Sequence, residues 1–175
     1  HAHSGFSTFD GLGYPADHID FILSEQQGMD AWALTDHGTG SGLAHARSHT
    51  AKMQKAGRKY RQLYGVEFYF VPSLTQWKDD YEQAKIDRAL AKQKAIKEDS
   101  DAGHVIENEE ETKNYEVGKD EWKRRYHLVV TAQDREGLGN LFTLIKRAYT
   151  EGFYRYPRID FNLLKQHGRG LNVST

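Results

Sequence analysis

The chain has 175 residues, of which 38% are hydrophobic and 28% charged, and its formal net charge is −1. This near-neutral balance excludes a domain that holds nucleic acid by bulk positive charge, so any such contact is local or is made by another part of a longer protein. The absence of cysteine excludes disulfides and thiolate metal sites, and no apolar run is long enough to span a bilayer, so we expect a cytoplasmic domain with no membrane partner.

Amphipathic and short apolar segments alternate before residue 75. Pro15 and Asp17 suit a first helical turn, so a helix is expected over 16–27 with Gly28 as its C-cap. The elements expected next are a buried strand over 31–35, a loop from Asp36, a helix over 41–56 closed by Gly57, and a strand over 62–70. This succession predicts an α/β fold with a parallel sheet or a barrel.

Residues 75–125 interrupt this alternation. Lysine and glutamate mix through 78–99. An acidic cluster follows at Glu107, Glu109, Glu110 and Glu111. We interpret the whole stretch as a charged insertion, made of a solvated helix and then a polar loop or small hairpin.

The alternation returns after residue 125. The expected elements are a strand over 127–132, a helix over 136–151 ended by Gly152, a short helix over 160–167 and a strand over 171–174. One side of the long helix is apolar and carries Leu138, Leu141, Phe142, Ile145 and Tyr149.

The first candidate site residues lie at the start of the chain. His1 and His3 are two positions apart, so in an extended backbone both imidazoles point the same way and can bind one metal ion. A disordered, tag-like terminus has the same pattern. Asp10 precedes Gly11, which is typical of a turn, and it is also a candidate carboxylate to bridge or cap a metal cluster.

Asp36 and His37 follow a buried strand, the position where catalytic groups collect in α/β barrels. The alternative is that Asp36 caps the next helix and His37 lies at the surface. Glu67 interrupts an apolar strand, where a carboxylate is costly unless it is paired or binds metal. An exposed face of an edge strand also accommodates it. His127 opens its strand, so the rule for strand ends does not place it, and a histidine without a ligand role remains open.

Arg155 and Arg158 are candidate contacts for substrate phosphate, because guanidinium matches phosphate oxygens, although ordinary surface arginines are equally consistent. Tyr154 and Tyr156 can stack bases or simply pack. The remaining histidines match no motif and are expected at the surface: His18, His45, His49, His104 and His167.

The order of these motifs resembles the PHP (polymerase and histidinol phosphatase) family. The matching segments are His1-Ala-His3-Ser4, Asp10-Gly11, Thr35-Asp36-His37-Gly38, Glu67 within Gly-x-Glu-x-Tyr, and His127-Leu-Val-Val. Within that family, the segments 3–11, 28–38 and 134–153 are similar to the N-terminal PHP domain of a bacterial-type DNA polymerase III alpha subunit. The resemblance covers residues 1–175 as one domain fragment, apart from the insertion.

The resemblance implies a distorted TIM-like (β/α)7 barrel of the PHP type, incomplete at both ends, with further ligands beyond Thr175. It implies two or three divalent ions (Zn, Mn or Fe). The implied metal ligands are His1, His3, Asp10, His37, Glu67 and His127. His37 and Glu67 are the implied catalytic residues, together with Asp36, which orients a ligand.

The function implied is a metal-dependent phosphoesterase, either a 3′–5′ exonuclease used in proofreading or a structural metal-binding role in DNA replication. Its partners are then a single-stranded DNA 3′ end, the remaining polymerase domains and the replisome subunits. One alternative is a stand-alone PHP phosphatase acting on a small phosphomonoester such as histidinol phosphate. Another is a non-catalytic scaffold that holds metal only for folding.

Overall fold

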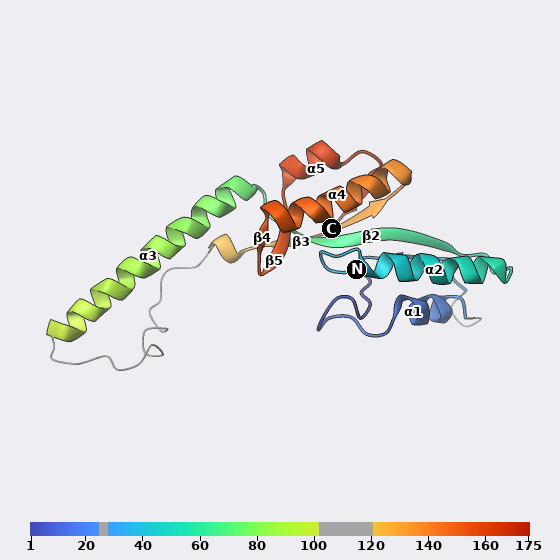
Figure 1. The fold of residues 1–175 in the computed structure, drawn as a ribbon, viewed down its shortest axis with the longest axis horizontal. Helices are drawn as coiled ribbons and strands as arrows, with labels where there is room; N and C mark the ends of the chain where they lie inside the picture. Colours follow the sequence, from blue (N-terminus) through green and yellow to red (C-terminus); the bar gives the residue numbers. More distant parts are fainter. Residues whose placement is uncertain (25–27, 102–120) are drawn as a thin grey trace. The chain divides into compact units, whose positions relative to one another are not determined.

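The computed structural model describes residues 1–24, 28–101 and 121–175. The chain divides into two compact units (Figure 1). The first unit joins His1–Leu74 to Arg125–Thr175, and the second is Thr75–Arg124. The helices and strands of the first unit are α1 (Pro15–Ile22), β1 (Ala31–Leu34), α2 (Ser41–Lys55), β2 (Arg61–Phe70), β3 (Tyr126–Ala132), α4 (Arg135–Glu151), β4 (Phe153–Tyr154), β5 (Tyr156–Ile159), α5 (Phe161–His167) and β6 (Leu171–Ser174).

The strands of the first unit form a mixed sheet around β2. The order is β4-β5-β2-β3-β6, and β1 also pairs with β2. β1 and β5 run parallel to β2, whereas β3 runs antiparallel to it and β6 antiparallel to β3. The α/β class is confirmed, but the expected parallel sheet is wrong for β3 and β6. Among the described residues the sheet is open, so the predicted distorted (β/α)7 barrel, expected to be incomplete at both ends, is not confirmed.

Helices cover this sheet on two sides. In Figure 1, α4 and α5 lie on one side of β2 and α1 and α2 on the other. α4 packs on β3 and β5, and α1 packs along α2. Val66 and Phe68 of β2 are fully buried, as are Leu141 and Leu144 of α4. Burial of these apolar side chains is the main force that holds the sheet and helices together.

Two sequence-based expectations about helices need correction. The buried side of α4 carries Gly137, Leu141, Leu144 and Ala148, whereas Phe142 and Tyr149, which were assigned to its apolar side, are each 48% exposed. α1 ends at Ile22 with Leu23 as its C-cap, well before Gly28. Its start agrees with the sequence, because Asp17 accepts a hydrogen bond from the N–H of Tyr14 at 2.7 Å.

The second unit contains most of α3 (Leu74–Asp101) and a short 3₁₀ helix, Glu121–Lys123. The Trp77 indole donates a hydrogen bond to the carbonyl of Trp122 at 2.8 Å, and Tyr81 packs on the Trp122 ring. The predicted hairpin, the acidic cluster from Glu107 to Glu111 and His104 lie outside the described residues. No helix among the described residues is both long and apolar enough to cross a membrane.

Candidate metal centre

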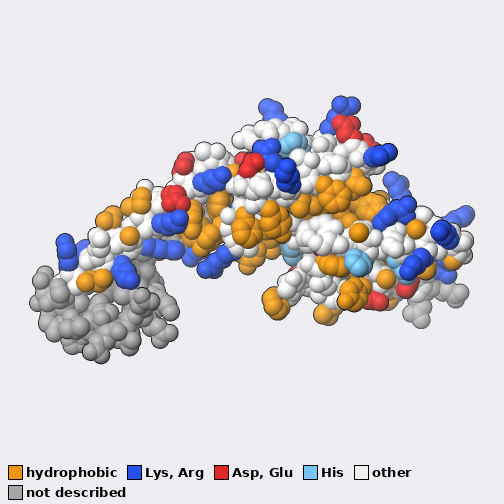
Figure 2. Space-filling view, in the orientation of Figure 1, with side chains coloured by type: hydrophobic (Ala, Val, Ile, Leu, Met, Phe, Trp, Pro, Cys, Tyr) orange, Lys and Arg blue, Asp and Glu red, His pale blue; other side chains and the backbone are white. Residues whose placement is uncertain are grey.

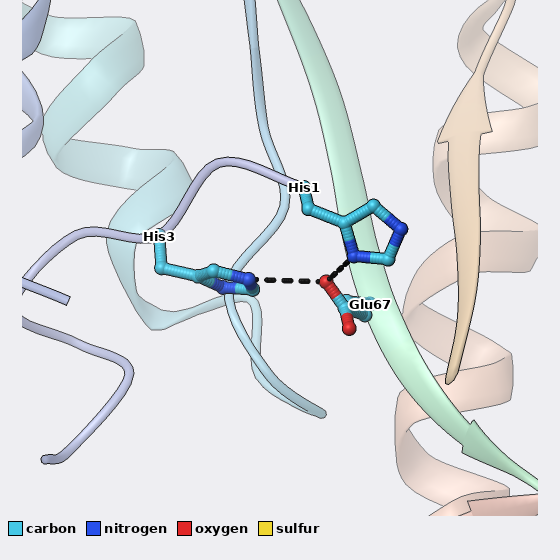
Figure 3. A group of neighbouring side chains, drawn as sticks. All are labelled: His1, His3 and Glu67. Atoms are coloured by element: carbon cyan, nitrogen blue, oxygen red, sulfur yellow. Dashed lines mark hydrogen bonds and ion pairs between the residues drawn. The ribbon is translucent and has the colours of Figure 1, made fainter. Parts of the chain in front are cut away.

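The first residues of the chain lie in an extended arrangement against the end of β1. The N–H of Ala2 donates to the Thr35 hydroxyl at 2.8 Å, and the N–H of Thr35 donates to the carbonyl of Ala2 at 2.9 Å. Because residues two apart in an extended chain share a side, His1 and His3 point together. Both rings converge on one carboxylate oxygen, Glu67 Oε2, at 2.5 Å from His1 Nδ1 and 3.0 Å from His3 Nε2 (Figure 3).

The other oxygen of Glu67 faces a second pair of histidines. Glu67 Oε1 lies 2.5 Å from His127 Nδ1 and 3.8 Å from His37 Nδ1. The Glu67 side chain is only 1% exposed. The buried carboxylate therefore separates four imidazoles into two pairs, one on each oxygen, which is the arrangement expected of a group that bridges two cations.

The direction of β3 explains why His127 belongs to this cluster. β3 runs antiparallel to β2, with Tyr69 opposite His127 and Glu67 opposite Val129. The start of β3 therefore lies beside the end of β2, and alternate side chains share a face of the sheet. His127 therefore lies on the same side of the sheet as the residues that follow strand ends, which local patterns did not indicate because the sheet was expected to be parallel.

His37 and Asp10 form a third part of the cluster. His37 Nε2 lies 2.9 Å from Asp10 Oδ2, and the His3 and His37 rings stack with their centroids 4.3 Å apart. The turn that presents Asp10 needs glycine at position 11, because a Cβ there would lie 2.0 Å from the Ser4 carbonyl oxygen. The structure thus brings together all six predicted ligand positions, and their role as metal ligands stays a prediction.

Asp36 lies beneath the cluster and does not face it. Its side chain is buried, and its carboxylate accepts hydrogen bonds from the N–H of Ser4 at 2.7 Å and from the hydroxyls of Ser4 and Ser7 at 2.9 Å each. It does not cap α2, whose N-cap is Gly40. These contacts fit the predicted role of Asp36 as a residue that orients a ligand, because they hold the N-terminal segment in place, and that role stays a prediction.

Ser7 transmits this anchoring to the histidines. Its hydroxyl lies 2.9 Å from Asp36 Oδ1, 3.0 Å from the N–H of His37 and 3.3 Å from His3 Nδ1. Because Asp36 acts only as an acceptor, Ser7 donates its single hydrogen to it and accepts from the other two groups. His3 therefore carries its hydrogen on Nδ1, and the lone pair of Nε2 faces Glu67 Oε2 at 3.0 Å and Asp10 Oδ2 at 3.8 Å.

These contacts fit bound cations. A ring lone pair that faces two carboxylate oxygens is unfavourable unless a proton or a metal ion lies between them. His37 Nδ1 is buried without a hydrogen-bond partner among the described residues. Three sets of ligand atoms lie within 4.8 Å of one another, and they are His1, His3 and Glu67; His3, Asp10 and His37; and His37, Glu67 and His127. Imidazole and carboxylate ligands suit Zn, Mn or Fe.

The environment of His37 predicts a dependence on pH. Burial lowers the pKa of His37 below its usual 6.5, and the rings of His3 and His127 act in the same direction, against the opposing charges of Glu67 and Asp10. In the metal-free protein the unfolded chain then binds more protons than the folded one below pH 6.5. The contribution of His37 to stability is therefore present above pH 6.5 and is lost as the pH falls through the folded pKa.

Urea unfolding of metal-free wild type and His37→Gln between pH 5 and 8 measures this contribution. Below pH 6.5, the unfolding free energy of wild type should decrease relative to that of His37→Gln. Above pH 6.5 the difference between the two proteins should stay constant. A difference that stays constant across this range contradicts the expected direction of the pKa shift.

The two candidate phosphate contacts differ in the structure. Arg158 is 2% exposed, and its Nη1 donates to the carbonyls of Tyr154 and Tyr156 at 2.7 and 2.9 Å. This buried position contradicts a phosphate contact, because the guanidinium binds the hairpin backbone. Arg155, at the turn between β4 and β5, is exposed, and for it the contact stays a prediction.

A cavity of about 560 Å³ adjoins Asp10 and His37. Its other lining residues include Phe9, Tyr69, Tyr149, Arg155 and Tyr156. Figure 2 shows hydrophobic side chains gathered over the β4 and β5 hairpin and the adjacent α4. Sequence reasoning missed Phe9, Tyr69 and Tyr149 as cavity residues. Tyr69 and Tyr149 lie in a strand and a helix, where aromatic residues are usually core residues, and Phe9 lies in a turn. Tyr149 lies outside the buried side of α4. Its exposure depends on how the helix packs, which the local sequence does not indicate.

Fold and cluster together define an α/β domain with a group of histidine and carboxylate side chains of the kind that holds divalent cations. A family model described as "PHP domain" matches residues 1–175, and the chain belongs to this family.

The similar proteins named DNA polymerase III subunit alpha agree with this assignment. That of Treponema pallidum is 28% identical over 173 residues, which are 98% of this chain and 11% of the relative. That of Aquifex aeolicus is 30% identical over an alignment of 179 residues, which covers 100% of this chain and 12% of the relative. That of Deinococcus radiodurans is 28% identical over 173 residues, 98% of this chain and 10% of the relative. The chain thus spans about a tenth of the length of these relatives.

Proposed function

We propose that this chain is the metal-dependent phosphoesterase domain of a DNA polymerase III alpha subunit, and that it removes nucleotides from a single-stranded DNA 3′ end during proofreading. The observation that carries the proposal is Glu67, a buried carboxylate with two imidazoles at each oxygen. Such a group suits two adjacent cations, and paired cations are a recurrent solution for phosphoester hydrolysis.

Each residue of the cluster then has a distinct task. Glu67 would contribute one oxygen to each of two ions, His1 and His3 would hold one ion, and His37 and His127 would hold the other. Asp10, together with His3 and His37, offers a place for a third ion. When bound, such ions lower the pKa of a bound water to supply hydroxide and neutralise charge on the phosphoryl group.

The residues around the cluster fix the orientation of the ligands. Asp36 and Ser7 hold His3 with its hydrogen on Nδ1, so that Nε2 faces the carboxylates. Thr35 holds the backbone of Ala2 between the two N-terminal histidines. Orientation by such outer partners raises metal affinity because the ligands need not be ordered when the ion binds.

The proposed partners follow from the relatives. Because the similar proteins are named as a subunit of a DNA polymerase, we propose DNA, the remaining polymerase domains and the replisome subunits as partners, in the cytoplasm of a bacterial-type cell. The net charge of −1 is consistent with a domain that meets only the end of a strand and relies on other domains to hold the rest.

The test uses the full-length subunit that contains this domain, loaded with Mn²⁺ or Zn²⁺ and without nucleoside triphosphates. We expect release of mononucleotides from the 3′ end of a labelled single-stranded oligonucleotide, with loss of this activity and of bound metal in His37→Ala. His49→Ala is the matched control, because His49 lies on α2 and pairs with Asp20 at 2.7 Å, outside the cluster.

Other outcomes would replace the proposal. Turnover of histidinol phosphate without action on DNA identifies a small-molecule phosphatase. Metal binding that raises the melting temperature, without hydrolysis of any ester, identifies a structural metal site.

A further inference from the structure

We propose that Phe9 and Arg155 bind the terminal nucleotide of the substrate in the cavity beside the cluster, Phe9 by stacking on its base and Arg155 by contacting its phosphate. This inference rests on the proposed function and adds the residues that select the substrate. Neither residue belongs to the groups of candidate ligand residues.

The backbone conformation first singles out these two residues. Within residues 1–24, 28–101 and 121–175, the non-glycine residues with positive φ are Phe9, at 68°, and Arg155, at 59°. Side chains other than glycine, asparagine and aspartate are disfavoured in this left-handed region. The two residues come from distant parts of the sequence, yet both line the same cavity. Backbone strain of this kind tends to persist at functional sites.

Folding does not explain the side chain at position 9. The tight turn around it is closed by hydrogen bonds from the N–H groups of Asp10 and Gly11 to the carbonyl of Ser7, at 2.9 and 3.0 Å. A glycine or asparagine suits this turn better than phenylalanine. The Phe9 side chain is fully exposed, at 105% relative accessibility, so it contributes little to the core. Packing of the ring therefore does not offset the free-energy cost of the left-handed backbone at Phe9.

Position 155 has the same combination of strain and exposure. Arg155 forms the turn between Tyr154 and Tyr156, which pair across the hairpin. Its guanidinium lies over the Tyr154 ring, 5.6 Å from the ring centre, and its side chain is exposed. A glycine fits this φ without strain, whereas arginine adds a cation at the wall of the cavity.

The hairpin is fixed against the metal centre by a close contact. Gly38, directly after His37, has φ of 60°, and a Cβ there would lie 2.5 Å from Cγ of Pro157. The β4 and β5 hairpin thus packs on the loop that carries His37. Arg155 and the cluster therefore hold a defined spacing, which is what a site needs in order to place a phosphate near bound ions.

The cavity suits a nucleotide better than a small aliphatic phosphomonoester. Aromatic rings from Phe9, Tyr69, Tyr149 and Tyr156 line it, and aromatic faces stack on bases of any sequence. A guanidinium at its wall matches phosphate oxygens. The volume of about 560 Å³ lies in the range of ligand pockets. An aliphatic phosphomonoester makes no use of the aromatic lining.

The test compares Phe9→Gly with wild type in the full-length, metal-loaded subunit, on single-stranded oligonucleotides that end in a 3′ thymidine or a 3′ abasic sugar. Wild type should have a KM lower by about 5- to 150-fold for the intact end, the range for one base–aromatic stack. Phe9→Gly should lose this discrimination while its melting temperature stays equal or rises, because the strain is relieved. Arg155→Gly should raise KM for both ends, with exposed Arg169→Ala as the control.

A second readout does not depend on hydrolysis. An oligonucleotide with 3′-terminal 4-thiothymidine should photo-crosslink to the peptide that contains Phe9 in wild type. If hydrolysis is absent but the crosslink forms and is lost in Phe9→Gly, the nucleotide site stands and the proposed reaction does not. If hydrolysis proceeds and Phe9→Gly keeps both the discrimination between the two 3′ ends and the crosslink, the proposed site is overturned. A melting temperature of Phe9→Gly below that of wild type also overturns it.

Discussion

Glu67→Gln should abolish metal binding at both halves of the centre, so that elemental analysis of the purified protein shows close to no bound Zn or Mn. Each oxygen of Glu67 faces two imidazoles. An amide has one acceptor oxygen, and its NH₂ group repels a cation on the other side. The rate of hydrolysis should fall by more than the about 10- to 100-fold loss that is typical when an outer partner of a metal ligand is mutated.

The same variant separates metal binding from folding. In the presence of a chelator at pH 8, Glu67→Gln should be no less stable than wild type, because a neutral amide replaces a carboxylate buried without a cation. Wild type should gain about 2.7 kcal/mol of stability for each bound ion when metal is added at about 100 times its Kd, and the variant should gain none.

The matched control is Glu136→Gln, because Glu136 is exposed on α4 and pairs with Arg169 at 3.3 Å. It should keep both the metal content and the metal-induced stabilisation. If Glu67→Gln keeps two bound ions, or is much less stable in chelator while it still binds metal, the bridging role of Glu67 is wrong.

Asp36→Asn should have the second large effect, which combines lower stability with weaker metal binding. The Asp36 carboxylate accepts hydrogen bonds from the N–H of Ser4 and from the hydroxyls of Ser4 and Ser7 while it is 1% exposed. Asparagine presents an NH₂ group to at least one of these donors. A buried donor left without an acceptor costs about 1–3 kcal/mol, so we expect a destabilisation in this range in urea unfolding.

Weaker metal binding follows from the loss of ligand orientation. Without Asp36 as its acceptor, Ser7 is free to donate to His3 Nδ1, and the His3 hydrogen can move to Nε2, which faces Glu67. Calorimetric titration should show about a 10- to 100-fold loss of affinity, and ¹⁵N NMR of His3 should show a mixture of tautomers in place of the Nδ1–H form.

Asp20→Asn is the control, since Asp20 is an exposed carboxylate whose contact is with His49. It should leave the metal affinity and the His3 spectrum unchanged. Asp36→Asn could instead lose stability while it keeps the wild-type metal affinity and a single His3 tautomer. That result would limit Asp36 to a structural role.

Local patterns predicted the parts of the site that depend on local geometry. His1 and His3 point together because their backbone is extended, and Glu67 is recognisable because a carboxylate within an apolar strand needs a partner. The strands around them were also predicted to within a residue or so, because they are short apolar runs ended by polar loops. These features depend on the period of the side chains and on the cost of burying charge.

Features that depend on tertiary pairing could not be predicted from local patterns. Only the family resemblance implied His127 as a ligand, because its place in the cluster depends on the antiparallel pairing of β3 with β2. Arg158 is buried within the β4 and β5 hairpin, where its guanidinium binds backbone carbonyls. These two- and four-residue strands, the second with Pro157, carry no periodic signal. The cavity likewise needs the N-terminal turn and the hairpin at the same place, although their residues lie at opposite ends of the sequence.

The contacts of Glu67 with His1 and His127 span 66 and 60 residues of chain. Contacts of such long range form late and slow the folding of small domains. The denatured chain therefore holds no preassembled half of the centre, and cations have little to capture before β2 and β3 pair. Metal uptake should consequently lag behind the formation of helices during refolding, which makes it a reporter of the pairing of β2 with β3.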